Sequence, residues 1–355
     1  MSREKLKAIR REISAHDIDA LLVTNTINRF YLSGFSGSSG LLLISAEKAF
    51  LLVDFRYLEQ AADQAPDFET VKRQEDLYPT LLELIDNNGF KRIGFEAKDL
   101  VYQDYQKLAE KLPVQLIPLE ESVERLRVIK SAEELNILRQ GAALLDRAFE
   151  FLKKEIKAGM QEKELARELE IYLLRQGAQE RSFKFIVASG PRGAMPHGTA
   201  TEKILQRNEM VTIDFGMIFN GYATDMTRTF SIGKPDQEML TVYETVFRAQ
   251  QEAAAAVKPG RKAKEIDAVA RDIIEEAGYG DYFGHGLGHG VGLEVHEAPT
   301  LNARSETVLK PGMIITVEPG IYLPGQGGVR IEDMVHVTAN GMELLTGSER
   351  KLVII

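Results

Sequence analysis

One hairpin restricts what this chain can fold into more than any other segment does. Residues 209–230 carry two runs of alternating apolar and polar residues, and Asn220-Gly221 separates the two runs. Asn-Gly is a favoured two-residue hairpin turn, because both residues tolerate the positive φ angles that this turn requires. The sequence therefore predicts two antiparallel strands in which Phe219 lies opposite Tyr222.

The register of this hairpin brings two carboxylates together. Counting outward from the turn, Asp214 lies opposite Thr227, and Asp225 lies two residues from Thr227 on the same face. Diagonal neighbours on paired strands are about 7–8 Å apart, so both side chains can reach one centre. Two carboxylates on a partly buried face repel each other unless a positive charge lies between them, and a metal ion supplies that charge. The alternative is a pair of exposed aspartates, which the apolar residues on both sides disfavour.

The histidines gather in the C-terminal half of the chain, where five of the six follow residue 190. His285 and His289 stand four residues apart, as in a helical zinc motif. The alternating glycines of residues 284–290 make a helix costly there, so we expect a glycine-lined loop that brings the imidazoles close to other backbone. For any single histidine, the alternative is a structural role.

Two glutamates lie in strand-like segments. Glu318 ends an apolar run just before Pro319-Gly320, and Glu332 lies in the alternating run 327–337, on one face with Arg330. A glutamate inside an apolar strand is rarely buried without a partner. The alternatives are a surface position and a simple ion pair between Glu332 and Arg330.

Together these side chains form an oxygen-rich ligand set with four carboxylates and one imidazole. Its members are Asp214, Asp225, His289, Glu318 and Glu332. The chain has no cysteine, so thiolate ligands and disulfides are excluded. Such a set suits divalent ions, with Mn²⁺ favoured and Co²⁺, Zn²⁺ or Fe²⁺ as alternatives. Five ligands, several of which can bridge, suit two ions about 3.5–4 Å apart.

The rest of the chain divides into two regions. Residues 1–120 alternate between helical patterns and strand-like runs, which is typical of an α/β domain. The expected helices there are 3–16, 56–65, 78–88 and 99–111, and the expected strands are 18–23, 40–44, 49–53, 92–95 and 114–118. The glycine-rich segment 34–40 is predicted to be a loop, because it lacks the strand and helix of a dinucleotide site.

A break near residues 119–127 leads into the second region. Ser131 and Glu134 have the spacing of a capping box, which opens a helix that runs to about residue 157. Further helices are expected at 161–177, 236–257 and 263–277, and strand patterns dominate the remainder from residue 183 onward.

The ordered ligand set and the motifs around it resemble the pita-bread metallopeptidases, in the branch of creatinase, aminopeptidase P and prolidase. The matching motifs are Pro196-His197-Gly198, Asp214-Phe215-Gly216, residues 284–290, His296-Glu297-Ala298-Pro299, Val317-Glu318-Pro319-Gly320 and residues 328–333. The resemblance implies an α/β (α+β) architecture with two domains. A smaller creatinase-like domain would occupy residues 1–125, and a pita-bread catalytic domain, with an antiparallel sheet flanked by helices, would occupy residues 126–355.

The resemblance also implies a role for each ligand. Asp214 and Asp225 would bind one ion, and Asp225 would bridge to the second. His289 and Glu318 would complete the side of the second ion, and Glu332 would bridge both. Glu318 is also the expected proton shuttle to the departing proline nitrogen. None of the five positions is substituted, which disfavours metal-free relatives such as creatinase.

Five other residues are expected around the substrate. The resemblance implies that His197 and His296 contact the substrate or stabilise the tetrahedral intermediate, with His296 preferred for the oxyanion. It implies that Arg330 orients the bridging carboxylate or binds a substrate carboxylate. It implies that His285 either lines the substrate pocket or supports the residues that hold the metal, and Tyr222 is the remaining candidate substrate contact.

The resemblance implies metal-dependent hydrolysis of the N-terminal Xaa-Pro bond by a hydroxide held between two ions. The Xaa-Pro bond is a tertiary amide without an N–H group, so a dedicated pocket is physically reasonable. The first expectation is an Xaa-Pro dipeptidase (prolidase) acting on Xaa-Pro dipeptides. The alternatives are an Xaa-Pro aminopeptidase (aminopeptidase P) acting on longer proline-containing peptides and, from another class, a non-catalytic binding protein that reuses the fold.

Charge and hydropathy set expectations about partners and location. The chain has 44 Lys and Arg against 53 Asp and Glu, a net charge of −9, and no basic stripe, so nucleic acid is not expected as a partner. The first residues lack the apolar segment of a signal peptide, and no apolar run is long enough to span a membrane, so a cytoplasmic protein is expected. The resemblance implies a homodimer in which Arg56 could reach a neighbouring site, and the alternative for Arg56 is an ion pair with Asp54.

Overall fold

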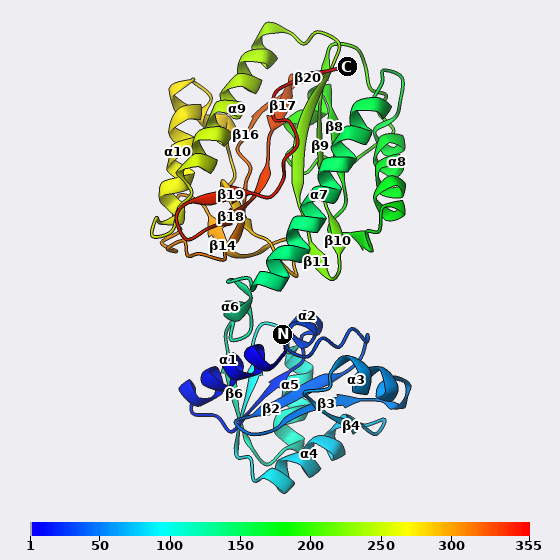
Figure 1. Ribbon diagram of the computed structural model, residues 1–355, viewed down its shortest axis with the longest axis vertical. Helices are drawn as coiled ribbons and strands as arrows, with labels where there is room; N and C mark the ends of the chain where they lie inside the picture. Colours follow the sequence, from blue (N-terminus) through cyan, green and yellow to red (C-terminus); the bar gives the residue numbers. More distant parts are fainter. Residues whose placement is uncertain (1) are drawn as a thin grey trace. The chain divides into compact units, whose positions relative to one another are not determined.

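The computed structural model describes residues 2–355, which divide into one compact unit up to Arg127 and another over Val128–Ile355 (Figure 1). The first unit contains one six-stranded sheet in the order β4-β3-β2-β1-β5-β6. Its strands are β1 Ala20–Val23, β2 Leu41–Ser45, β3 Ala49–Val53, β4 Glu69–Lys72, β5 Arg92–Glu96 and β6 Gln115–Leu119. The sheet is mixed, because β1 pairs antiparallel with β2 and parallel with β5.

Six helices accompany this sheet. They are α1 Ser2–Ala15, α2 Thr26–Ser33, α3 Leu58–Gln64, α4 Leu77–Asn88, α5 Tyr102–Lys111 and α6 Glu124–Arg127. Buried apolar residues of α4 and α5 pack on one face of the sheet. The elements predicted for this region are confirmed, and segment 34–40 is a loop. The sequence pattern missed β4 and α2, and α2 was hidden because it buries the polar Asn28 and Arg29 among its apolar residues.

Two pairs of helices cover the strands of the second unit. The helices are α7 Ala132–Glu155, α8 Glu162–Arg175, α9 Gln237–Ala256 and α10 Ala263–Glu276, close to the predicted ranges. The predicted capping box of Ser131 and Glu134 is present at the start of α7. Apolar side chains of α7 and α8 share one core with a four-stranded sheet, whereas those of α9 and α10 share another core with the strands that follow them.

The strands of this unit form four sheets, in the orders β20-β12-β9-β8, β11-β10-β7, β14-β13-β15-β18-β19 and β16-β17. Their bounds are β7 Glu180–Arg181, β8 Ile186–Ser189, β9 Glu209–Phe215, β10 Met217–Phe219, β11 Tyr222–Ala223, β12 Met226–Ile232, β13 Gly288–Gly290, β14 Glu297–Leu301, β15 Ile314–Val317, β16 Gly320–Leu323, β17 Gly327–Arg330, β18 Asp333–Val337, β19 Met342–Leu344 and β20 Val353–Ile354. None of the helices among residues 2–355 is long and apolar enough to cross a membrane.

The predicted hairpin is confirmed in its turn and its register. Asn220 and Gly221 both have positive φ, at 48° and 81°, as the expected turn requires. Phe219 pairs with Tyr222, and further from the turn Thr227 pairs with Asp214. Each strand is interrupted near Gly216, yet the register continues unchanged, so the two aspartates reach the positions that the sequence predicts.

The run 327–337 is not the single strand that its alternation predicted. It splits into β17, which pairs with β16, and β18, which pairs with β15 and β19. The break falls at Ile331 and Glu332, where the Glu332 N–H donates to the Thr227 carbonyl on β12 (3.1 Å). The prediction failed because residues of both strands are buried on both faces, so alternation does not mark one continuous face.

Candidate active site

The five predicted metal ligands come from five different places in the second unit. Asp214 lies near the end of β9, and Asp225 lies between β11 and β12. His289 is the middle residue of β13, Glu318 follows β15, and Glu332 lies at the break between β17 and β18. The pairing of short strands thus brings Asp225, His289 and Glu332 into one cluster, with Asp214 and Glu318 beside it.

The side chains meet at hydrogen-bonding or ligand distances. One ligand atom from each of Asp225, His289 and Glu332 lies within 4.8 Å of the other two. His289 Nε2 is 3.2 Å from Glu318 Oε1 and 3.7 Å from Asp225 Oδ2. His289 Nδ1 is 3.1 Å from the Gly290 carbonyl and donates to it, which turns Nε2 toward the carboxylates. Burial lowers the pKa of His289, but the hydrogen bond to Glu318 and the charge of that carboxylate outweigh burial and raise the pKa overall.

Glycines allow His289 to reach this point. A Cβ added at Gly288 would lie 2.1 Å from the Thr316 carbonyl oxygen, and one added at Gly290 would lie 2.2 Å from the Ala298 carbonyl oxygen. No side chain fits at either distance. The glycine-lined loop predicted for this segment is confirmed, with a three-residue strand at its end.

Three carboxylate oxygens in this cluster are buried and have no hydrogen-bond partner: Asp214 Oδ1, Asp225 Oδ1 and Glu332 Oε1. Unpartnered buried polar atoms are costly and rare. Burial, followed by mutual repulsion, raises the pKa of Asp225 and of Glu332 well above the ordinary value. A positive charge among these oxygens would satisfy them and hold the carboxylates ionised, so the residues fit divalent cations.

Arg330 aligns two of the candidate ligands. It is buried, and its Nη2 donates to Asp214 Oδ2 at 2.6 Å. Its Nε donates to Thr227 Oγ1 at 3.2 Å, and Thr227 Oγ1 in turn donates to Glu332 Oε2 at 2.7 Å. The oxygens of Asp214 and Glu332 that do not face Arg330 or Thr227 are the unpartnered ones. Of the two roles expected for Arg330, the geometry favours orienting carboxylates over binding a substrate carboxylate.

A directed chain of hydrogen bonds links Arg330 to His285. His285 Nδ1 is 2.8 Å from the Gly286 carbonyl and must donate to it, so Nε2 accepts from the Tyr322 hydroxyl at 2.9 Å. The Tyr322 oxygen in turn accepts from Arg330 Nη1 at 2.9 Å. Burial lowers the pKa of His285, which keeps it in the neutral form that this chain requires. His285 therefore supports the site through Tyr322.

Sequence reasoning missed Tyr322, Thr227 and Thr316. Thr316 Oγ1 accepts from the His289 N–H at 3.0 Å and lies 3.1 Å from Glu318 Oε1, to which it donates. The available signals were positional: Tyr322 and Thr316 each lie an even number of residues from Glu318. Hydroxyl groups at such positions carry no distinctive pattern of their own.

His296 and His197 are the exposed histidines of the site. The rings of His296 and His289 have centroids 4.2 Å apart. Desolvation and then the nearby His289 lower the pKa of His296, which favours a neutral imidazole. His197 is close enough to lower the pKa of both His285 and His296. Both exposed rings are therefore placed beside the carboxylate cluster.

Tyr222 is buried, and its hydroxyl donates to Glu134 Oε1 at 2.7 Å, at the start of α7. That bond ties the hairpin to the helix, and a substrate contact by Tyr222 stays a prediction.

In the first unit, Arg56 forms a two-point ion pair with Asp54, with both bonds at 2.9 Å, and lowers the pKa of Asp54 to about 2. The ion-pair alternative for Arg56 is confirmed, and contact with a neighbouring site stays a prediction.

Comparison with known proteins identifies the family. Residues 136–339 match metallopeptidase family M24, and residues 5–129 match the creatinase/prolidase N-terminal domain. The chain is similar to the Xaa-Pro dipeptidase of Pyrococcus horikoshii, with 40% identity over 353 residues that cover 99% of each chain. It belongs to metallopeptidase family M24.

Solved structures agree with this assignment. An Xaa-Pro dipeptidase from Bacillus anthracis superposes with a TM-score of 0.98 at 43% identity and 100% coverage of both chains. An X-Pro aminopeptidase from Thermotoga maritima superposes with a TM-score of 0.92 at 37% identity, covering 97% of this chain and 100% of that chain. The resemblance to the pita-bread family and the expected fold class are confirmed. The protein is a prolidase-like metallo-exopeptidase, and its family implies divalent metal ions.

Proposed function

We propose that this enzyme hydrolyses the N-terminal Xaa-Pro bond of dipeptides with two divalent ions at its centre. The observation that carries the proposal is the set of three buried, unpartnered carboxylate oxygens on Asp214, Asp225 and Glu332, beside the Nε2 of His289 that faces Asp225 and Glu318. The similarity to chains described as Xaa-Pro dipeptidases, at 40% and 43% identity, supports the substrate class.

The five side chains Asp214, Asp225, His289, Glu318 and Glu332 would hold the ions. Bound divalent ions supply an acidified water and polarise the scissile carbonyl. Glu318 is the residue placed to move a proton. Burial raises its pKa, but the hydrogen bond to His289 and the charge on that ring outweigh burial and lower the pKa overall. An ionised Glu318 can take a proton and deliver it to the proline nitrogen as the bond breaks.

The exposed histidines serve the substrate side of the centre. A neutral His296 can donate an N–H to the oxyanion that develops on the scissile carbonyl. His197 can contact the far end of a short substrate. Arg330 is less suited to that task, because its guanidinium already donates to Asp214, Thr227, Tyr322 and the Pro196 carbonyl. Since the Xaa-Pro nitrogen carries no hydrogen, none of these residues needs to accept one from it before cleavage.

A second candidate function is Xaa-Pro aminopeptidase activity on longer peptides. The similarity to the X-Pro aminopeptidase of Thermotoga maritima favours it. The test compares an Xaa-Pro dipeptide with an Xaa-Pro-Yaa tripeptide, each with added Mn²⁺, Co²⁺, Zn²⁺ or Fe²⁺. Cleavage of the dipeptide alone supports the dipeptidase, and comparable cleavage of both supports the aminopeptidase. No cleavage of either with any ion overturns the proposal.

We further propose Mn²⁺ as the native metal, a homodimer as the working assembly and the cytoplasm as the location. The oxygen-rich donor set supports Mn²⁺. The creatinase-type N-terminal domain, through the resemblance, supports the homodimer. A chain without cysteine suits a reducing compartment. Elemental analysis of the protein purified without added metal, light scattering and cell fractionation test the three statements.

A further inference from the structure

Glu332 does not take part in a sheet ladder, and a neighbouring strand holds it instead. It lies in the break between β17 and β18, where its N–H donates to the Thr227 carbonyl at 3.1 Å. Its Oε2 accepts from Thr227 Oγ1 at 2.7 Å, and its carbonyl oxygen accepts from Arg228 Nη1 at 2.5 Å. Two consecutive residues of β12 therefore fix the backbone and the side chain of a candidate bridging ligand.

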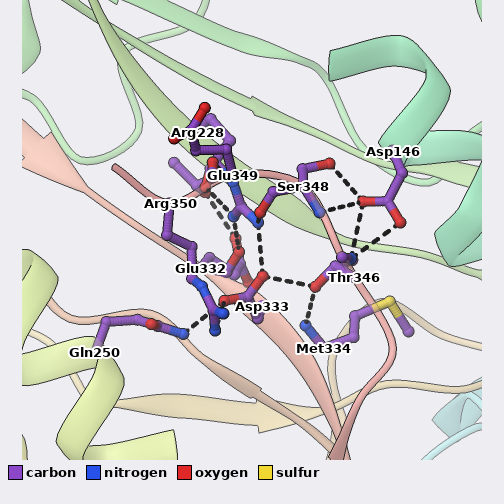
Figure 2. A network of polar contacts seen from close by, with 12 residues as sticks. Asp146, Arg228, Gln250, Glu332, Asp333, Met334, Thr346, Ser348, Glu349 and Arg350 are labelled. Carbon is purple, nitrogen blue, oxygen red and sulfur yellow. Dashed lines mark hydrogen bonds and ion pairs between the residues drawn. The ribbon is translucent and has the colours of Figure 1, made fainter. Parts of the chain in front are cut away.

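Arg228 is itself fixed on every nitrogen. Its side chain is 1% exposed, and Nη1 also donates to the Thr227 carbonyl at 3.0 Å. Nη2 donates to Asp333 Oδ1 at 2.7 Å and to the Ser348 carbonyl at 3.0 Å, and Nε donates to the Glu349 carbonyl at 3.1 Å. Figure 2 shows the guanidinium between the segment that carries Glu332 and the C-terminal segment.

Asp333 faces away from the candidate metal ligands. It is fully buried, and its Oδ1 accepts from Arg228 and from Thr346 Oγ1 at 2.7 Å. Its Oδ2 accepts from Gln250 Nε2 at 2.7 Å and lies 3.4 Å from Arg350 Nη1 (Figure 2). Asp333 is therefore the counter-charge that orients the guanidinium of Arg228. Both of its oxygens accept from donors, so it has no position left for a cation.

We propose that Arg228 and Asp333 are positioning residues that set where the Glu332 carboxylate stands between two bound ions. This inference rests on the proposed function, since it assigns the pair a task at that metal centre. A buried ion pair is often no more stable than apolar residues of similar volume, so stability alone does not account for it. The hydrogen bond from Arg228 to the Glu332 carbonyl does account for the pair, because a shift of this peptide would move the carboxylate that would bridge the two ions.

The test uses two variants that separate positioning from stability. R228K keeps the charge, but one ammonium group cannot reach the Glu332 carbonyl, Asp333 and the C-terminal carbonyls together. R228M/D333L removes both members of the pair at once, so neither is left as an unpaired buried charge, while the Glu332 carbonyl still loses its donor. It also removes the contact between Asp333 and the partly exposed Arg350. The second variant keeps the test decisive if the first fails to fold.

The readouts are Co²⁺ stoichiometry by equilibrium dialysis, the visible absorption of bound Co²⁺, and thermal unfolding of the metal-free protein. We expect both variants to unfold cooperatively, to show an altered Co²⁺ spectrum, and to bind the second ion about 10- to 100-fold more weakly. The matched control is D146N. Asp146 holds the same C-terminal segment, by accepting from the N–H groups of Gly347 (2.9 Å) and Ser348 (2.8 Å), without touching Glu332 or Arg228.

The outcomes are distinct for the two proposals. D146N should lower the unfolding temperature and leave the Co²⁺ spectrum and stoichiometry unchanged. If R228K or R228M/D333L folds and binds two ions with the affinity and spectrum of the unmodified enzyme, the positioning role is overturned while the proposed function stands. If the unmodified enzyme does not bind two ions, the proposed function fails first, and the positioning role fails with it.

Discussion

Arg330 Nη2 lies 2.6 Å from Asp214 Oδ2, and this ion pair is buried beside the other candidate ligands. Because the guanidinium also donates to Thr227, one side chain sets the direction of two carboxylates. Breaking this pair should therefore alter the centre more than it alters the fold.

We expect R330K to lower kcat about 10- to 100-fold, because an ammonium group keeps the charge but cannot donate in two fixed directions. Steady-state kinetics and thermal unfolding check this. R139K is the control, since Arg139 forms a two-point pair with Glu343 at the surface (2.6 and 2.9 Å), and its loss should cost no more than about 1 kcal/mol and no activity. Equal effects of the two substitutions would contradict the orienting role.

Neutralising Asp225 should abolish turnover and yet stabilise the metal-free protein. Burial, followed by repulsion from Glu332, raises the pKa of Asp225. The metal-free protein therefore loses stability as pH rises above the ordinary carboxyl range, because the unfolded chain releases this proton more readily than the folded protein does. D225N is isosteric and removes that cost. In the presence of a chelator, the unfolding temperature should fall less between pH 5 and pH 8 for D225N than for the unmodified enzyme. Turnover of an Xaa-Pro dipeptide by D225N would argue against its role as a ligand.

His296 should affect turnover without affecting metal content. We expect H296A to lower kcat by about 10²- to 10³-fold, the range for loss of one oxyanion donor, with the metal retained. The control is H336A, because His336 pairs with Glu343 (3.0 Å), outside the candidate ligand set. Elemental analysis accompanies the kinetics, and loss of metal from H296A would show that His296 is a ligand.

Glu162 should govern substrate affinity through the loop that carries His197. It is fully buried and accepts from the N–H of Ser189 at 2.9 Å and of Thr201 at 3.1 Å, at both ends of that loop. Arg192, inside the loop, also pairs with it.

We expect E162Q to raise KM about tenfold, a loss of about 1.4 kcal/mol in binding, with little change in metal content. K163M is its neighbour control, since Lys163 makes an exposed pair with Glu202 (3.1 Å). An unchanged KM in E162Q would separate the loop from substrate binding.

Glu96 should make the first unit less stable as pH rises. It is buried, and although it accepts from the N–H groups of Thr24 (2.7 Å) and Asn25 (2.8 Å), burial raises its pKa. The unfolded chain therefore loses this proton first, at about pH 4.3, and stability falls from there until pH passes the raised pKa. Urea unfolding of the full chain at several pH values should show this fall, and E96Q should remove it. A fall of equal size in E96Q would assign the effect to other groups.

The sequence predicted the parts of the site that local rules determine. The Asn220-Gly221 turn fixes a register, and a register fixes which residues face each other, so Asp214 and Asp225 could be paired without a structure. The glycines around His289 predicted a close approach to backbone for the same local reason. Assignment of the five side chains to two ions came from resemblance and stays a prediction.

What the sequence did not predict depends on contacts that no local pattern reveals, and some of them join residues that are far apart along the chain. The break at Glu332 is set by Thr227 and Arg228, more than 100 residues earlier. Tyr322 fits only because Gly320 and Gly328 leave room for its ring, since an added Cβ at either would lie within 2.9 Å of it. Alternation along one strand does not report the strand or sheet that packs against it.

Arg228 donates to the Ser348 and Glu349 carbonyls, so the candidate metal centre is completed only after the end of the chain has been synthesised. During synthesis, residues up to Arg127 leave the ribosome first and form a compact unit with its own core. Asp214 on β9 and Asp225 just before β12 emerge more than 100 residues before the backbone that holds Arg228 in place. A nascent chain that ends between residues 333 and 347 would carry every candidate ligand and still lack the two carbonyls that fix Arg228, so full peptide cleavage should begin only when translation has passed that point.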